Sequence, residues 1–314
     1  MTLVVGTDEA GYGPNLGPLV VAATAWRIAA DPGDAEQAIA AAVAAAAATA
    51  GPLWGDSKRI YRGGGGFAAL ERGALVGAAL AAAGPPGSWD ELAAALHLAA
   101  PADAAAPEAE RLAACRLPVE AEADACRRLA ALVAASLAAH GVTLVGIRCH
   151  VVQPVAFNRQ LDAGLNKSDI LSQATLDLAA ALAADGDGAP VVVWCDRHGG
   201  RRRYAGLLTR HFAAPLVRVV EETADSSRYE IPAARCLVEF TVGGEARTPV
   251  ALASMTAKYV RELAMRAFNA HWGALAPKVA PTAGYPVDAA RWRREAAAAV
   301  AAAGIPWDAV WRRA

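Results

Sequence analysis

The distribution of apolar and polar residues along the chain predicts both strands and helices. Short apolar runs that are bounded by turn residues are typical of buried strands. Such runs predict strands at residues 3–5, 17–26, 142–152, 191–196, 216–222 and 236–242. The last two strands are expected to be joined by a polar loop that contains Asp225-Ser226-Ser227-Arg228.

Helices are predicted where alanine is abundant or where apolar residues recur at helical spacing. They are expected at residues 35–50, 119–139, 251–272 and 288–303, and Gly51-Pro52 should end the first of them. A further helix should end near residue 184 and begin behind Ser168 or Ser172, because serine is a favoured N-cap residue.

The composition limits the classes of protein that need to be considered. The chain has 314 residues, 55% of them hydrophobic, which permits a substantial core. Its net charge of −1 gives no overall basic signal, so a nucleic-acid partner would need local basic patches. The N-terminus has no basic region followed by an apolar core, and we expect neither a signal peptide nor a membrane-spanning helix.

The cysteines indicate a reducing environment. There are five, at positions 115, 126, 149, 195 and 236, an odd number without a CxxC pair. This pattern favours free thiols in a cytoplasmic protein over a disulfide framework or a zinc site.

The most informative stretch follows the first apolar run, where two adjacent carboxylates, Asp8 and Glu9, precede a glycine-rich turn. Neighbouring side chains of a strand point to opposite faces, so these two acids could share one ligand position only if the strand ends or kinks between them. Gly11 and Gly13 would supply such a kink, and they would let the backbone approach a phosphate. A dinucleotide-binding fingerprint is excluded, because its glycines open a helix and its acid follows about 20 residues later. A tight turn with a solvated acidic pair and a metal-binding carboxylate pair remain as alternatives.

A resemblance supports the metal-binding alternative. Asp8-Glu9-Ala10-Gly11-x-Gly13-Pro14, followed by Gly17-Pro18-Leu19-Val20-Val21, resembles the opening signature of the type 2 ribonucleases H, ribonucleases HII and HIII. The resemblance implies a single α/β domain over residues 1–314 with a ribonuclease H-like fold, in which helices flank a mixed central sheet. Residues 84–140 depart most from the family and are expected to form a helical insertion.

The resemblance also implies a set of metal ligands. Asp196 ends an apolar run and matches a strand-ending aspartate of the family. Glu245 is the preferred fourth acid because of its spacing from the segment that ends at Lys258, and Asp225 is the alternative. With Asp8 and Glu9 these acids would hold two Mg²⁺ or Mn²⁺ ions, since hard oxygen ligands suit those metals better than zinc.

Several other residues are expected to contact substrate. They are Gly11, Tyr12, Gly13, Asp56, Ser57, Lys58, Arg201 and Lys258. Asp56-Ser57-Lys58 is similar to a motif of the family that contacts the nucleic-acid backbone. Arg201 belongs to a basic cluster with Arg197, Arg202 and Arg203. Taken alone, each has a plainer explanation as a polar loop, a solvated basic face or a surface charge. Tyr285 could stack on a sugar or base or pack on Trp292, and His198 is expected at the surface.

The implied activity is hydrolysis, by a monomer, of the RNA strand of RNA/DNA hybrids or of ribonucleotides embedded in DNA. In this chain the Gly-Arg-Gly or Gly-Lys-Gly of the family is replaced by Gly11-Tyr12-Gly13. A phenol carries no charge, so we expect hybrids to be preferred over a single embedded ribonucleotide. Two alternatives stay open: a related nuclease that acts on another nucleic acid, and a nucleic-acid-binding module that does not cleave.

Overall fold

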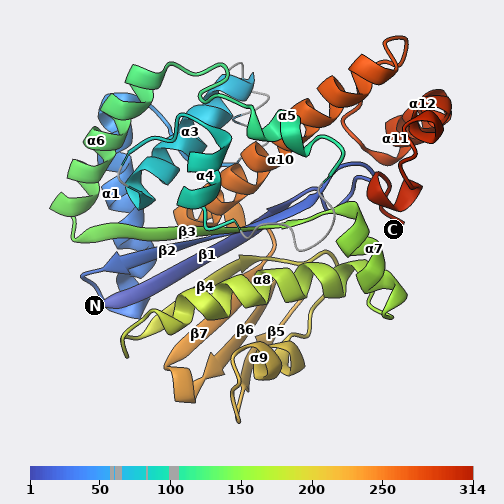
Figure 1. Cartoon of the computed structure of the whole chain (residues 1–314). Helices are drawn as coiled ribbons and strands as arrows, with labels where there is room; N and C mark the ends of the chain where they lie inside the picture. The colour runs from blue at the N-terminus through green and yellow to red at the C-terminus, as the bar shows by residue number, and fades with distance from the viewer. Residues whose placement is uncertain (57–59, 61–65, 83, 99–105, 314) are drawn as a thin grey trace.

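A mixed β-sheet forms the centre of the molecule (Figure 1). The computed structural model describes residues 1–56, 60, 66–82, 84–98 and 106–313, and within them seven strands lie in the order β3-β2-β1-β4-β7-β6-β5. The strands are β1 Thr2–Ala10, β2 Leu19–Ile28, β3 Val142–Val152, β4 Val191–Asp196, β5 Arg218–Glu222, β6 Ser226–Ile231 and β7 Cys236–Thr241. β4 is parallel to β1 and β7, and the other neighbouring pairs are antiparallel.

Helices cover both faces of this sheet. They are α1 Ala35–Ala50, α3 Gly66–Ala81, α4 Trp89–Ala95, α5 Ala109–Ala113, α6 Ala123–Ala139, α7 Pro154–Asp162, α8 Lys167–Ala184, α9 Ala205–His211, α10 Thr248–Leu275, α11 Pro286–Glu295 and α12 Ala297–Ala302. Short 3₁₀ turns lie at Pro32–Asp34, Pro232–Ala234, Gly244–Ala246 and Trp307–Ala309. In Figure 1, α1, α3, α6 and α10 lie above the sheet, and α8 and α9 lie below it. The expected α/β fold with a mixed central sheet and flanking helices is confirmed.

The start of α10 packs directly on β1 because residue 6 is glycine. A Cβ atom added to Gly6 would lie 2.3 Å from the carbonyl carbon of Pro249, closer than real Cβ contacts come. On the neighbouring strand, the hydroxyl of Thr24 donates a hydrogen bond of 2.8 Å to the Pro249 carbonyl oxygen. These contacts fix the first turns of α10 over the middle of β1, so the later residues of α10 lie beside the carboxyl end of that strand.

Two local expectations were wrong. The N-cap of α8 is Asn166, whose side chain accepts from the Asp169 N–H while the Asp169 carboxylate accepts from the Asn166 N–H, which completes a capping box. Ser168 therefore lies inside the helix, and Ser172 is buried in it. The segment after Asp225, expected to be a loop, forms strand β6 between β5 and β7.

Helices from residues 84–140 share a core with the rest of the chain. Leu92 of α4 and Cys126 and Val133 of α6 belong to one buried cluster with residues of β2, α3 and α10. The Glu71 carboxylate of α3 is fully buried, and it accepts hydrogen bonds from the backbone N–H groups of residues 119, 120 and 121 and from the Tyr259 hydroxyl of α10. This carboxylate joins the segment before α6 to the helices that lie on the sheet.

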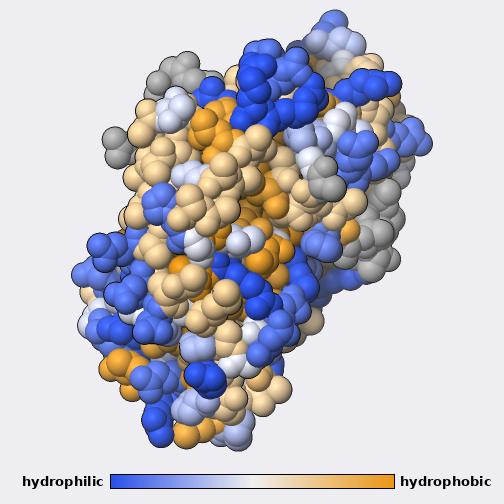
Figure 2. All heavy atoms as spheres, turned by 90° about the vertical axis from the view of Figure 1, so that its left-hand side faces the viewer, coloured by the Kyte–Doolittle hydropathy of each residue, from blue (hydrophilic) through white to orange (hydrophobic). Residues whose placement is uncertain are grey.

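Part of the molecular surface is moderately hydrophobic. In Figure 2, which views the molecule from the left side of Figure 1, moderately hydrophobic residues cover much of the middle of the face. Exposed alanines of α1 include Ala40, Ala41, Ala44 and Ala45. No helix in the described part of the chain has both the length and the apolar character needed to cross a bilayer, and all five cysteines are free thiols.

Candidate functional site

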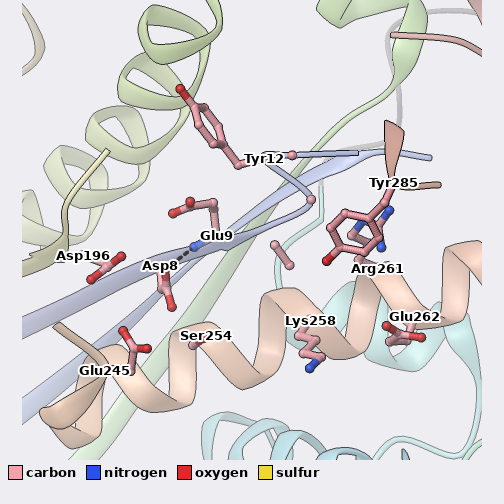
Figure 3. A pocket seen from close by; sticks show the side chains of 13 residues that line it. Asp8, Glu9, Tyr12, Asp196, Glu245, Ser254, Lys258, Arg261, Glu262 and Tyr285 are labelled. Atoms are coloured by element: carbon pink, nitrogen blue, oxygen red, sulfur yellow. Dashed lines mark hydrogen bonds between the residues drawn. The ribbon is translucent and has the colours of Figure 1, made fainter. Parts of the chain in front are cut away.

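Five acidic residues line one pocket of about 270 Å³, and four of them come from three segments outside the middle of α10 (Figure 3). These four are Asp8 and Glu9 of β1, Asp196 at the end of β4, and Glu245 in the short turn before α10. The remaining lining residues are Ala10, Gly11, Tyr12, Gly13, Ser254, Lys258, Arg261, Glu262 and Tyr285. The structure therefore brings together the four acids that the sequence predicted, and it places the glycine turn and Lys258 beside them.

Asp196 and Glu245 are held close by the packing of a turn against a strand end. Asp196 is the last residue of β4, and its Oδ1 accepts a hydrogen bond of 2.8 Å from the N–H of Gly244. A Cβ atom at Gly244 would lie only 3.1 Å from the Asp196 Cα atom, so glycine lets this turn approach the strand. Glu245, the next residue, is thereby fixed beside the end of β4.

Asp8 and Glu9 reach the pocket from different sides of β1. The strand continues regularly through both residues, which pair with Ala22 and Val21 of β2, so the expectation that the strand ends or kinks between them was wrong. The pairing of β1 with β4 stops at Thr7, one residue earlier. In Figure 3 the Asp8 side chain points toward α10 and Glu245, whereas Glu9 points toward Tyr12. The pocket extends around the strand end, so both acids line it.

The carboxylates act on one another electrostatically. The pKa of Asp8 lies well above its ordinary value because of burial first, and then because of the negative charges of Glu9 and Asp196, while a hydrogen bond with Ser254 opposes the shift. Among the residues that the structure describes, no three Asp, Glu, His or Cys side chains are close enough together to hold a metal ion. The donor set nevertheless consists of carboxylates, the ligands that hard divalent cations prefer, and a bound cation would relieve the repulsion at Asp8.

Two buried arginines support the glycine turn. Arg261 of α10 donates to the carbonyl oxygens of Leu16 and Ala283, and Arg312 donates to those of Gly11 and Pro14. Burial first, and then the nearby Arg261, lowers the pKa of Arg312 to about 9, so the Arg312 guanidinium remains charged at neutral pH. The sequence pattern did not reveal Arg312, because about 300 positions separate it from the turn and it belongs to no motif.

Tyr12 lies between the acidic pocket and α8. The Lys167 ammonium lies over the Tyr12 ring, 4.7 Å from its centroid, in a cation–π geometry. Arg201 forms an ion pair with Asp169, and its Nε donates to the Ser168 hydroxyl at 3.2 Å. The sequence pattern did not reveal the contact of Lys167, because this residue lies far from Tyr12 in sequence and belongs to no motif.

Other predicted site residues lie elsewhere. Asp225 is exposed in the turn before β6, its carbonyl oxygen accepts from the Val242 N–H, and its side chain does not line the pocket. Asp56 is half-buried and also lies outside the pocket lining, while Ser57 and Lys58 fall outside the residues that the structure describes. Tyr285 lines the pocket and is 57% exposed, whereas Trp292 is buried against Phe268 and Trp272.

Two expectations about the segment after β4 need correction. Arg197 is buried and donates to the carbonyl oxygens of Thr223 and Ala224, so it fixes the turn before β6 and does not belong to a surface cluster. His198 is only 1% exposed, its Nδ1 lies 2.9 Å from the Ser172 hydroxyl, and burial lowers its pKa to about 3. It is a neutral core residue, contrary to the surface position expected for it.

The comparisons with known proteins concern the fold. No protein-family model matches the sequence, and no curated protein matches it in sequence. The chain is similar to RNase HII of Archaeoglobus fulgidus, solved in a complex with PCNA, with a TM-score of 0.46 and 17% identity over 99% of this chain and 94% of that chain. It is also similar to ribonuclease H2 of Pyrococcus horikoshii OT3 (TM-score 0.45, 15% identity, 98% and 92% of the two chains). For Bst-RNase HIII in complex with Mn²⁺ the TM-score is 0.47 and the identity 15%, over 99% of this chain and 66% of that chain. At such low TM-scores and identities these likenesses assign no activity to this chain and no role to its residues.

Proposed function

We propose that this protein is a metal-dependent endonuclease of the ribonuclease H type, which hydrolyses the RNA strand of RNA/DNA hybrids or a ribonucleotide embedded in DNA. The proposal rests on one observation: three chain segments place Asp8, Glu9, Asp196 and Glu245 in the lining of one pocket, next to Lys258. Burial is the first cause of the raised pKa of Asp8, the negative charges of Glu9 and Asp196 raise it further, and bound cations would offset that repulsion.

The four carboxylates are the residues that would hold the cations. Their oxygens suit Mg²⁺ or Mn²⁺, and two such ions when bound supply an activated water and neutralise charge on the leaving oxygen. The hydrogen bond from Gly244 orients the Asp196 carboxylate, and the bond with Ser254 orients that of Asp8. Both contacts would hold the ligands in place before substrate arrives.

The residues around the acids would place the substrate. Lys258 offers a positive charge for a phosphate oxygen, and Gly11 and Gly13 let the backbone of the turn approach the phosphodiester. Tyr12 can donate one hydrogen bond but carries no charge at neutral pH, because burial and then Glu9 raise the pKa of its phenol. We therefore expect cleavage within hybrids to exceed cleavage at a single embedded ribonucleotide.

The proposal is tested by incubating the protein, with Mg²⁺ or Mn²⁺, with four labelled substrates: a DNA duplex, an RNA duplex, an RNA/DNA hybrid and a DNA duplex that contains one ribonucleotide. We expect the hybrid to be cut fastest, the single ribonucleotide more slowly, and neither of the other duplexes to be cut. Asp196→Asn, which removes one charged ligand, should lower the cleavage rate at least a hundredfold while the protein stays folded. Equal rates for Asp196→Asn and the wild type, or no cleavage of any of the four substrates, would refute the proposed activity.

A further inference from the structure

A second hollow, lined by basic and polar residues, lies next to the acidic pocket. It has a volume of about 530 Å³ and is lined by Asn166, Ser168, Gly200, Arg201, Arg202 and Arg203. Among the described residues, no carboxylate belongs to its lining. We call this hollow, together with the neighbouring Lys167, the α8 basic surface.

The charges of the α8 basic surface differ in how freely they can meet a ligand. The Arg201 guanidinium is fixed by its ion pair with Asp169 and its bond to Ser168. Arg202 is exposed, and the side chain of Arg203 is 91% exposed, with Glu222 at the long distance of 3.8 Å. Such exposed arginines gain little from surface ion pairs and keep their donors available for a larger anionic partner.

Tyr12 connects the α8 basic surface to the acidic pocket. One side of the Tyr12 ring faces the pocket that it lines, and the ring also carries the Lys167 ammonium at 4.7 Å. The loop before Arg201 passes against the same ring, since a Cβ atom at Gly199 would lie 3.2 Å from the Tyr12 hydroxyl oxygen. A polymer that leaves the pocket over Tyr12 therefore meets Lys167 first and the arginines next.

The positive charges along this path lie where the phosphates of a nucleic-acid backbone would pass. Lys258 lies within the pocket, the four acids lie beside it, and the α8 basic surface lies beyond Tyr12. Burial and the nearby Arg312 lower the pKa of Lys167, so its ammonium is held where an added negative charge would stabilise it. With a net charge of −1, the protein would attract nucleic acid through local surfaces such as this one.

We propose that the α8 basic surface binds the phosphodiester backbone of the nucleic acid that enters the pocket, with Lys167 contacting the phosphate nearest Tyr12 and Arg202 and Arg203 contacting phosphates farther along the strand. This inference rests on the proposed nuclease function, because it identifies the path of the same substrate. The surface fixes the direction of the strand across the acids, and backbone contacts of this kind carry no sequence information.

The test measures binding without cleavage. In an Asp196→Asn background with Mg²⁺, the dissociation constant of a labelled RNA/DNA hybrid is measured by fluorescence anisotropy at several salt concentrations. The logarithm of the association constant falls linearly as the logarithm of the salt concentration rises. Each lost phosphate contact should make this slope less steep by about 0.7 to 0.9. We expect a reduction of about 1.5 for the double change Arg202→Gln and Arg203→Gln, and of about 0.8 for Lys167→Gln, with the slope retained in Lys167→Arg.

The matched control is the double change Arg127→Gln and Arg128→Gln. These are also consecutive arginines, with side-chain exposures of 59% and 70%, and they lie on α6 on the other face of the sheet. Slopes that stay equal in the α8 variants and in this control would overturn the inference even if the wild type cleaves hybrids. Reduced slopes in a protein that cleaves nothing would instead support the inference and refute the nuclease activity. If the α8 variants lost affinity only for polyglutamate, the surface would bind an acidic protein and the inference would be wrong.

Discussion

Asp8 and Glu9 are sequence neighbours with different surroundings. Asp8 is 8% exposed and lies toward Ser254 and α10, whereas Glu9 lies toward Tyr12 on the other side of β1. The motif was sufficient to predict that both acids lie near each other, and both line one pocket. It could not show that β1 continues past Glu9, because this depends on the pairing with β2, which goes on to Ala10 after the pairing with β4 has ended.

Glu245 and Asp225 were the two candidates for the fourth acid, and their positions lead to a prediction. Glu245 lines the pocket, while Asp225 is exposed in a turn of the sheet edge. Glu245→Gln should therefore raise the Mg²⁺ concentration needed for half-maximal cleavage by about tenfold, since one ligand charge is lost. Asp225→Asn serves as the matched control and should leave that concentration unchanged. If the metal titration instead showed a higher Mg²⁺ requirement for Asp225→Asn and an unchanged one for Glu245→Gln, Asp225 would be the fourth metal ligand.

The elements differ in how well the sequence predicted them. β3, β4 and α1 have the expected bounds because their apolar runs or alanine tracts are delimited by turns and glycines. β6 was missed although its alternate residues Ser227, Tyr229 and Ile231 are buried. Charged residues alternate with these buried ones, and the segment begins with Asp-Ser-Ser, which is typical of a loop. The alternating pattern of a strand was therefore not recognised, and the segment is a strand because it pairs with β5 and β7.

The attachment of the segment before α6 depends on a single carboxylate, which gives a second prediction. Glu71 accepts three backbone hydrogen bonds and one from Tyr259 in a fully buried position. An amide in its place keeps one acceptor oxygen and turns an N–H₂ group toward donors. Glu71→Gln should therefore lower the free energy of unfolding by about 2 to 4 kcal/mol.

The measurement is denaturant unfolding, with Glu91→Gln as the matched control. The Glu91 carboxylate accepts a backbone hydrogen bond from the Gly87 N–H at an exposed position, so the control should change the stability by less than about 1 kcal/mol. Equal effects of the two changes would mean that the Glu71 contacts do not hold this segment.

At the scale of the whole molecule, the glycine turn is assembled from segments that are far apart in sequence. Asn15 and Leu16 donate their N–H groups to the Gly284 carbonyl, and the Arg312 N–H donates to the Asn15 carbonyl. The Asn15 side chain in turn donates to the Arg312 carbonyl. The sequence predicted the turn from its glycines, but contacts over nearly the full chain length have no local pattern, so the two buried arginines behind the turn were not foreseen.

Arg312 should accordingly control the rigidity of this turn. One guanidinium nitrogen, Nη2, donates to the carbonyl oxygens of both Gly11 and Pro14. A lysine side chain is one bond shorter, so its ammonium would lose at least one of these two hydrogen bonds. The loss of one such hydrogen bond should lower the free energy of local opening of the turn by about 1.5 kcal/mol. Amide exchange of Asn15 and Leu16 in Arg312→Lys should therefore be about tenfold faster. Hydrogen exchange of the peptide that spans residues 11–17 measures this without reference to any enzymatic activity. Arg313→Lys is the control from the same segment, because the Arg313 guanidinium binds Asp162 and the Asn158 carbonyl and does not touch the turn. If exchange in residues 11–17 were the same in both variants and the wild type, the turn would owe its order to the Gly284 contacts and Arg261, and the assignment of this role to Arg312 would be wrong.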